Sequence, residues 1–146
     1  MKNLKAKWDK LTQGWFGTVI YVILGFIIAY SVMHGLSYAL NTETPVVAVF
    51  SESMVPVLQK GDMVFVYNDG TYDVGDIVVY HTQYRPYPII HRIIEIQGEN
   101  IRTKGDHNSI ADPWITPVSS VYGKTAIKIP LLGWVKIIFT EITGIA

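Results

Sequence analysis

The sequence predicts a mainly β protein, in which a small antiparallel β domain follows an N-terminal transmembrane helix. A long uncharged segment lies near the start of the chain, and short runs rich in Val, Ile, Phe and Tyr follow it. Clusters of turn-forming residues separate these runs, which is typical of short antiparallel strands. The 146 residues are enough for one modest domain and an anchor.

The predicted membrane span runs from Trp15 to Leu40, and none of its residues is charged. Its 26 residues exceed the roughly 20 that a transmembrane helix needs and the ~7–15 in the apolar core of a cleaved signal peptide. Residues 1–14 before it contain four lysines and a single aspartate. Because cationic flanks remain in the cytoplasm, we expect residues 1–14 to be cytoplasmic and the following domain to lie on the outer or lumenal face.

Residues 41–128 are predicted to form the β domain. The runs are separated by "QKGD", "NDGTYDVGD", "QYRPYP" and "QGEN", which are turn sequences. We expect strands at residues 44–50, 63–67, 76–81 and 89–96, and within residues 100–106 and 119–129.

The C-terminal segment, residues 129–146, is apolar but contains Lys136 and Glu141. Its length of about 18 residues is the lower limit for a span, and a charge near the centre of a span costs about 2.5–3.5 kcal/mol. A helix that lies on the membrane surface or packs on the anchor is therefore favoured over a second crossing, which stays open as the alternative.

Composition excludes several kinds of site. The formal net charge is zero, with 12 basic and 12 acidic residues, which argues against a nucleic-acid partner. The chain has no cysteine, so disulfides, thiolate nucleophiles and cysteine zinc sites are excluded.

Hydrolytic chemistry is suggested by a serine, a histidine and two aspartates. Ser53 follows an apolar run and precedes a proline, and a serine nucleophile needs a base that is oriented by a third group. Of the histidines after the anchor, His91 lies inside a predicted strand, which would place it rigidly. Asp106 and Asp112 lie in a turn-rich loop from which a carboxylate can reach back to a strand. Each of these residues is also common in strands or turns without any catalytic role. The residue types alone therefore do not show whether these positions are catalytic or structural.

The order of the motifs is more specific. The anchor is followed by "SESMVPVL", "GDIVVYH", "HRIIEI" and "GDHNSIAD", and this series resembles the type I signal peptidases in their archaeal and endoplasmic-reticulum form. The resemblance covers nearly the whole chain up to Asp112. It implies a compact, mostly β catalytic domain of the signal-peptidase type that cleaves exported preproteins without a cofactor or metal.

The resemblance also implies roles for individual residues. Ser53, directly before a methionine, matches the nucleophile, and His91 stands where the bacterial branch has a lysine base. Asp106 and Asp112 match two functionally important acidic residues; Asp106 is preferred as the orienter of the imidazole because it lies at a strand-to-loop junction. Ser51 matches a serine that helps to form the oxyanion hole in the bacterial branch.

Signal-peptide-bearing preproteins and the lipid bilayer are the expected partners, and accessory subunits remain open because the endoplasmic-reticulum relatives work in a complex. An extended substrate is expected to pair with the edge of the strand in "PIIHRI". The residues expected to line its site are Met54, Val55, Ile89 and Ile90. Core packing or membrane contact explains Met54 and Val55 equally well.

Three alternatives remain. Lys60 or Lys104 would be the base in a Ser-Lys enzyme, although both look like exposed turn residues. A metal enzyme would use two histidines and two carboxylates, namely His91, His107, Asp106 and Asp112. A membrane-tethered, non-enzymatic β module for partner binding would need none of these residues.

Overall fold

The structure is a computed structural model that describes residues 14–144. It contains two compact units, the first of which ends at Leu36 and the second of which begins at Ser37. Helix α2, Trp15–Ala39, forms nearly all of the described part of the first unit. Its 25 residues correspond to a length of about 37 Å, enough to cross a hydrocarbon core of about 30 Å. Within residues 14–144, α2 is the helix that is long and apolar enough to span a membrane.

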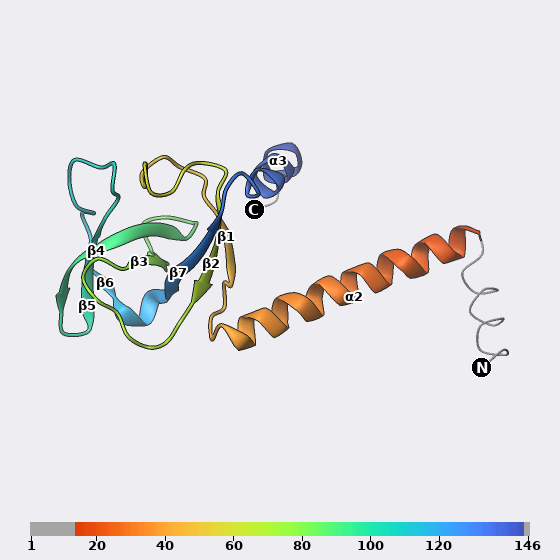
Figure 1. Cartoon of the computed structure of the whole chain (residues 1–146), viewed down its shortest axis with the longest axis horizontal. Coiled ribbons are helices and arrows are strands. Elements are labelled where there is room, and N and C mark those ends of the chain that lie inside the picture. The colour runs from red at the N-terminus through yellow and green to blue at the C-terminus, as the bar shows by residue number, and fades with distance from the viewer. Residues whose placement is uncertain (1–13, 145–146) are drawn as a thin grey trace. The chain divides into compact units, whose positions relative to one another are not determined.

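The second unit is built on one curled sheet of seven strands, all of whose pairings are antiparallel (Figure 1). The order across the sheet is β1-β2-β7-β3-β4-β5-β6. The strands are β1 Val46–Ala48, β2 Met63–Tyr67, β3 Ile77–Tyr80, β4 Ile89–Gln97, β5 Asn100–Lys104, β6 Thr116–Pro117 and β7 Val121–Ile129. A 3₁₀ turn, Val118–Ser120, joins β6 to β7. The predicted mainly β fold class is confirmed.

The alternation of side chains along the strands divides the core into two clusters. On β3, Val79 belongs to one cluster, whereas its neighbours Val78 and Tyr80 belong to the other. The first cluster also contains Met54 from the loop after β1, and the second contains Ile93 of β4. The loop that carries Ser53 is therefore fastened to the core by the residue next to it.

The strand predictions differ from the structure at the edges of the sheet. The run predicted at 44–50 pairs with β2 only from Val46 to Ala48. Beyond this point Val49 bonds to the turn before β2, donating to the carbonyl of Asp62 and accepting from the N–H of Gly61. Strand β6 was not predicted, because two residues are too few to show an alternating pattern.

The C-terminal segment contains a helix, α3, which runs from Trp134 to Thr143. Ten residues correspond to about 15 Å, about half the thickness of a hydrocarbon core. α3 packs beside β1, with Ile137 fully buried, and the indole of Trp134 lies against the backbone of Gly61. At Gly61, with φ of +94°, an added Cβ would overlap that indole.

Candidate active site

Ser53 lies in the loop between β1 and β2. Local backbone bonds shape this loop, from Val55 N–H to the carbonyl of Glu52 and from Leu58 N–H to the carbonyl of Met54. The Met54 side chain is 1% exposed and is inserted into the first core cluster. Ser53 itself is half-buried. A buried neighbour thus fixes the position of a serine that remains partly exposed.

His91 occupies the third position of β4 and pairs with Val78 of β3. Alternation places it on the side of the strand that Ile89 and Ile93 share, and it is 7% exposed. The imidazole is therefore held by a strand that pairs with β3 at His91 itself and with β5 from the next residue, Arg92.

Three side chains from distant parts of the sequence form one chain of contacts. His91 Nε2 lies 3.1 Å from Ser53 Oγ, and His91 Nδ1 lies 2.7 Å from Asp112 Oδ2. An ionised Asp112 can only accept, so Nδ1 carries the proton and Nε2 is left as an acceptor for the serine hydroxyl. This is the arrangement that a serine nucleophile, a general base and an orienting carboxylate require.

The Asp112 carboxylate is kept ionised by its hydrogen-bond donors. Its burial raises the pKa, but hydrogen bonds from His91, Thr103 and Tyr80 outweigh burial and hold the pKa below its ordinary value. Thr103 Oγ1 lies 2.6 Å and Tyr80 Oη 3.0 Å from Asp112 Oδ2. Burial raises the pKa of the Tyr80 phenol, which therefore remains a neutral donor.

Asp106 makes a different contact from the one we preferred in the sequence. Both of its oxygens bind the Arg92 guanidinium, at 2.8 Å from Nε and 2.7 Å from Nη2. This pair holds the pKa of Arg92 above its usual range. The preference for Asp106 as the carboxylate behind His91 is therefore wrong, since Asp112 occupies that position. Residue order cannot show which of two loop carboxylates turns toward the strand.

The loop after β5 also holds the backbone of Ser53. The N–H of His107 donates to the carbonyl of Ser53 at 2.8 Å. At Gly105 a Cβ atom would lie 2.6 Å from the same carbonyl and 2.9 Å from His91 Nε2, so no larger residue fits without movement. Figure 1 shows the β1–β2 and β5–β6 loops projecting on the same side of the sheet.

Ser51 lies beside the nucleophile candidate. Its Oγ is 3.2 Å from Ser53 Oγ, and its side chain is exposed. This distance allows one hydroxyl to donate to the other.

The residues predicted to line a substrate site have different environments. Met54 belongs to the core, which agrees with its core-packing interpretation. Val55 is half-buried, and so are Ile89 and Ile90. Strand β4 is not a sheet edge along most of its length, because it lies between β3 and β5. Its first three residues nevertheless extend past the last β5 pair, which joins Arg92 to Lys104, so this stretch is unpaired by β5.

The structure also places the residues of the alternative mechanisms. The Lys60 ammonium lies 5.5 Å from the centre of the Trp134 ring. Lys104 ends β5 opposite Arg92. Among the residues that the structure describes, no three histidine and carboxylate side chains converge as metal ligands would. Asp106 is paired with Arg92, so the four residues of the metal alternative do not form one set of ligands.

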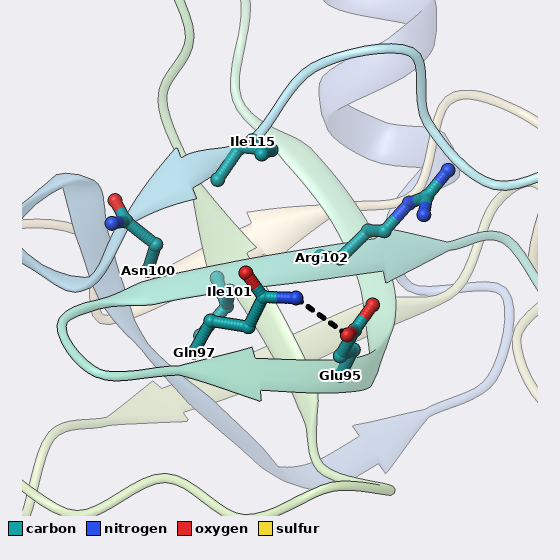
Figure 2. Close-up of a pocket in the computed structure, with 6 residues that line it drawn as sticks. All are labelled: Glu95, Gln97, Asn100, Ile101, Arg102 and Ile115. Atoms are coloured by element: carbon teal, nitrogen blue, oxygen red, sulfur yellow. Dashed lines mark hydrogen bonds between the residues drawn. The ribbon is translucent and has the colours of Figure 1, made fainter.

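A small hollow on the β4–β5 hairpin lies apart from these residues. Figure 2 shows it beside the Gln97–Glu95 hydrogen bond of 2.6 Å. Its lining contains none of the contacts of His91 and consists of Glu95, Gln97, Asn100, Ile101, Arg102 and Ile115.

Three residues that support the site were not predicted from the sequence. Tyr80 and Thr103 donate to Asp112, and Gly105 allows the loop to approach His91. Tyr80 and Thr103 look like ordinary strand residues in the sequence. Only their position on the strands either side of β4 indicates their role.

Comparison with known proteins gives the same assignment over most of the chain. Residues 17–127 match the family model described as signal peptidase, peptidase S26. The signal peptidase complex catalytic subunit SEC11 of Scheffersomyces stipitis is 34% identical, over 91% of this chain and 85% of that protein. The SEC11 proteins of Pyricularia oryzae and Yarrowia lipolytica are 35% and 33% identical, over 77% and 80% of this chain and 74% and 75% of theirs.

The matched region begins within α2 and includes the serine loop, the histidine strand and the aspartate loop. The relatives are named as catalytic subunits of the signal peptidase complex, which agrees with the family that the motif order predicts. The chain therefore belongs to the type I signal peptidases of the peptidase S26 family and is an enzyme of that family.

Proposed function

We propose that the protein is a membrane-bound serine endopeptidase that removes N-terminal signal peptides from exported preproteins. The observation that carries the proposal is the contact chain of Ser53, His91 and Asp112, with distances of 3.1 and 2.7 Å. A rigid strand, a core-anchored loop and a buried carboxylate hold the three groups within reach of one another.

In this mechanism His91 Nε2 takes the proton of Ser53 as the hydroxyl oxygen attacks the scissile carbonyl. Asp112 keeps the proton on Nδ1 and offsets the charge of the imidazolium as it forms. The imidazolium then protonates the leaving amine. A water molecule, deprotonated by the same imidazole, hydrolyses the acyl-enzyme and returns Ser53 to its starting form.

The Ser53 backbone N–H and the Ser51 hydroxyl are proposed to stabilise the oxyanion. Ser51 Oγ is 3.2 Å from the nucleophile oxygen, so it lies close to the position where the tetrahedral centre forms. One donor of this kind contributes about 3–4 kcal/mol to the transition state. Asp106 is proposed to act through Arg92, fastening the loop that supports Ser53.

The substrate is proposed to bind as an extended strand along the start of β4. The stretch from Ile89 to His91, beyond the end of β5, leads directly to the proposed base. A peptide paired there would bring its scissile bond to the serine through backbone hydrogen bonds. Val55, Ile89 and Ile90, all half-buried, are the proposed contacts for its side chains.

The preproteins would be cut on the outer or lumenal face. The basic residues that predict this orientation lie outside the described residues, among positions 1–13. Tethering through α2 would raise the effective concentration of enzyme near membrane-bound substrates. The SEC11 relatives are named as subunits of a complex, so accessory subunits are proposed here too.

The test is processing of a preprotein by the full chain in membranes. Ser53→Ala should abolish cleavage, whereas Ser119→Ala, at an exposed serine of the 3₁₀ turn, should leave it unchanged. Activity of wild type should be insensitive to a metal chelator. Unchanged processing by Ser53→Ala would instead favour the non-enzymatic module, and loss of activity with chelator would favour a metal enzyme.

We further propose that α3 lies on the membrane surface. One side of the helix packs on the β domain through Trp134 and Ile137. The other presents an exposed apolar stripe with helical spacing, made of Val135, Ile138, Phe139 and Ile142. Residues 40–45 alone separate α2 from β1, and β1 is the strand that α3 contacts. The short link would keep α3 close enough to contact a bilayer that α2 crosses.

The absence of cysteine allows this to be tested in the full chain reconstituted in vesicles. A polarity-sensitive dye on Ile142→Cys should report an apolar environment and be quenched by lipid-borne quenchers. The same dye on Ser119→Cys should report water. Equal signals at the two positions would contradict the membrane contact of α3.

A further inference from the structure

One oxygen of the Asp112 carboxylate lies within hydrogen-bond distance of three other side chains. Asp112 Oδ2 lies 2.7 Å from His91 Nδ1, 2.6 Å from Thr103 Oγ1 and 3.0 Å from Tyr80 Oη. The Tyr80 and Thr103 hydroxyls are also 2.9 Å apart. Trp114 Nε1 donates to Tyr80 Oη at 3.4 Å.

The protons of this cluster can be counted. Each hydroxyl has one proton, and the Thr103 contact is the shortest, so Thr103 donates to Asp112. The Tyr80 proton then goes either to Asp112 directly or to Thr103, which passes the interaction on. In both arrangements the two hydroxyls act on the oxygen that also receives the imidazole N–H.

The sheet places these two donors on either side of the base. Tyr80 ends β3 opposite Ile89, and Thr103 lies on β5 opposite Ile93. His91 lies between these two positions on β4, on the same side of the strand. Both donor side chains are completely buried, at 0% exposure, so solvent does not compete for their bonds.

We propose that Tyr80 and Thr103 are positioning residues of the peptidase, which hold Asp112 aimed at His91 Nδ1 and set how strongly Asp112 stabilises the imidazolium. This inference rests on the proposed roles of His91 and Asp112. Neither hydroxyl touches substrate or the reacting atoms; each acts through the carboxylate.

A definite pH effect follows from this role. Each hydroxyl that binds Oδ2 spreads the carboxylate charge and weakens its attraction for the imidazolium. Removing one donor should therefore favour the protonated, inactive imidazole and move the acid limb of the activity profile to higher pH.

The other groups around the pair do not supply this effect. Ser53 faces Nε2, and Trp114, which contacts the phenol, is uncharged. The charged neighbours in sequence, Arg92 on β4 and Asp106 in the loop, form an ion pair with each other.

The experiment compares kcat and KM as a function of pH for Tyr80→Phe and Thr103→Val in the full chain in detergent or vesicles. Both variants keep the shape of the side chain and remove only its donor. We expect kcat near pH 7 to fall about tenfold with KM little changed, mainly because Asp112 is no longer held in line with His91 Nδ1, and we expect the acid limb to move to higher pH by about half a unit. Thr103→Ser, which keeps the hydroxyl, should restore the wild-type profile.

The chain offers a matched control for each variant. Tyr72 is half-buried and its hydroxyl donates to Asn68 at 3.1 Å, away from Asp112, so Tyr72→Phe should leave the profile unchanged. Thr116 is 2% exposed, and among the described residues its hydroxyl has no hydrogen-bond partner. Thr116→Val should likewise leave kcat and its acid limb as in wild type.

Two results would overturn the proposal: wild-type kcat and acid limb in both Tyr80→Phe and Thr103→Val, or a loss in both that is uniform across pH. If the proposed serine mechanism itself were wrong, Ser53→Ala or Asp112→Asn would remain active, which distinguishes that outcome from failure of the present proposal. Thermal unfolding of each variant shows whether a loss of activity comes from loss of the fold.

Discussion

Replacing Asp112 by asparagine tests the assignment of the orienting carboxylate most directly. The pair with His91 has a length of 2.7 Å, and its side chains are only 9% and 7% exposed. At an effective dielectric constant of about 20, unit charges about 4 Å apart attract by ~4 kcal/mol. Loss of that attraction for the imidazolium corresponds to about a thousandfold in rate.

The asparagine amide can also turn its NH₂ group toward Nδ1, which would favour the wrong tautomer. In a serine protease of another fold this kind of substitution costs about 10⁴ in kcat. For Asp112→Asn we therefore expect kcat/KM near pH 7 to fall between about 10³-fold and 10⁴-fold. The assay is single-turnover cleavage of a fluorogenic signal-peptide substrate by the full chain in detergent.

Asp106→Asn is the matched control. It removes the same charge from the same loop, but from a carboxylate whose side chain is 16% exposed and is paired with Arg92. Because this carboxylate contacts the guanidinium of Arg92 and not the imidazole, we expect a loss at least about tenfold smaller than that of Asp112→Asn. Equal losses in the two variants, or an Asp112→Asn enzyme within about tenfold of wild type, would refute the assignment.

Three further predictions concern the support of the site. Gly105→Ala should reduce activity by more than tenfold, since its Cβ would lie 2.9 Å from His91 Nε2. Ser109→Ala in the same loop should leave activity unchanged. A fully active Gly105→Ala enzyme would contradict the close approach of the Gly105 backbone to His91. The stabilisation due to the lowered pKa of Asp112 is fully present above the unfolded value of about 3.9 and is lost as pH falls through the folded value. Denaturant titrations from pH 2 to 6 should therefore show an unfolding free energy that rises with pH, and the rise should be smaller in Asp112→Asn than in wild type. An equal rise in the two proteins would contradict a lowered pKa of Asp112. Gly61→Ala should lower the unfolding free energy by about 1–3 kcal/mol because its Cβ would displace the Trp134 indole, and an unchanged urea midpoint would show that this packing is not tight.

Local signals in the sequence determined the fold class and predicted the long apolar helix near the N-terminus. The 26 residues from Trp15 to Leu40 carry no charge, and as a helix they are long enough to span a membrane, because each helical residue adds about 1.5 Å. The run predicted at 63–67 coincides with β2, since alternation and turn residues act over a few positions. The order of the motifs identified the family and singled out Ser53 and His91, because each stands in a distinctive local sequence.

The tertiary structure alone decided which carboxylate contacts the imidazole. Asp106 and Asp112 lie six positions apart in one loop, and the sequence contains nothing that specifies the direction in which each turns. Arg92 pairs with Asp106. Tyr80 and Thr103 bind Asp112 beside His91, because β3 and β5 both pair with β4. Such contacts depend on strand register and loop path, which are set by the packing of the whole sheet and not by neighbouring residues.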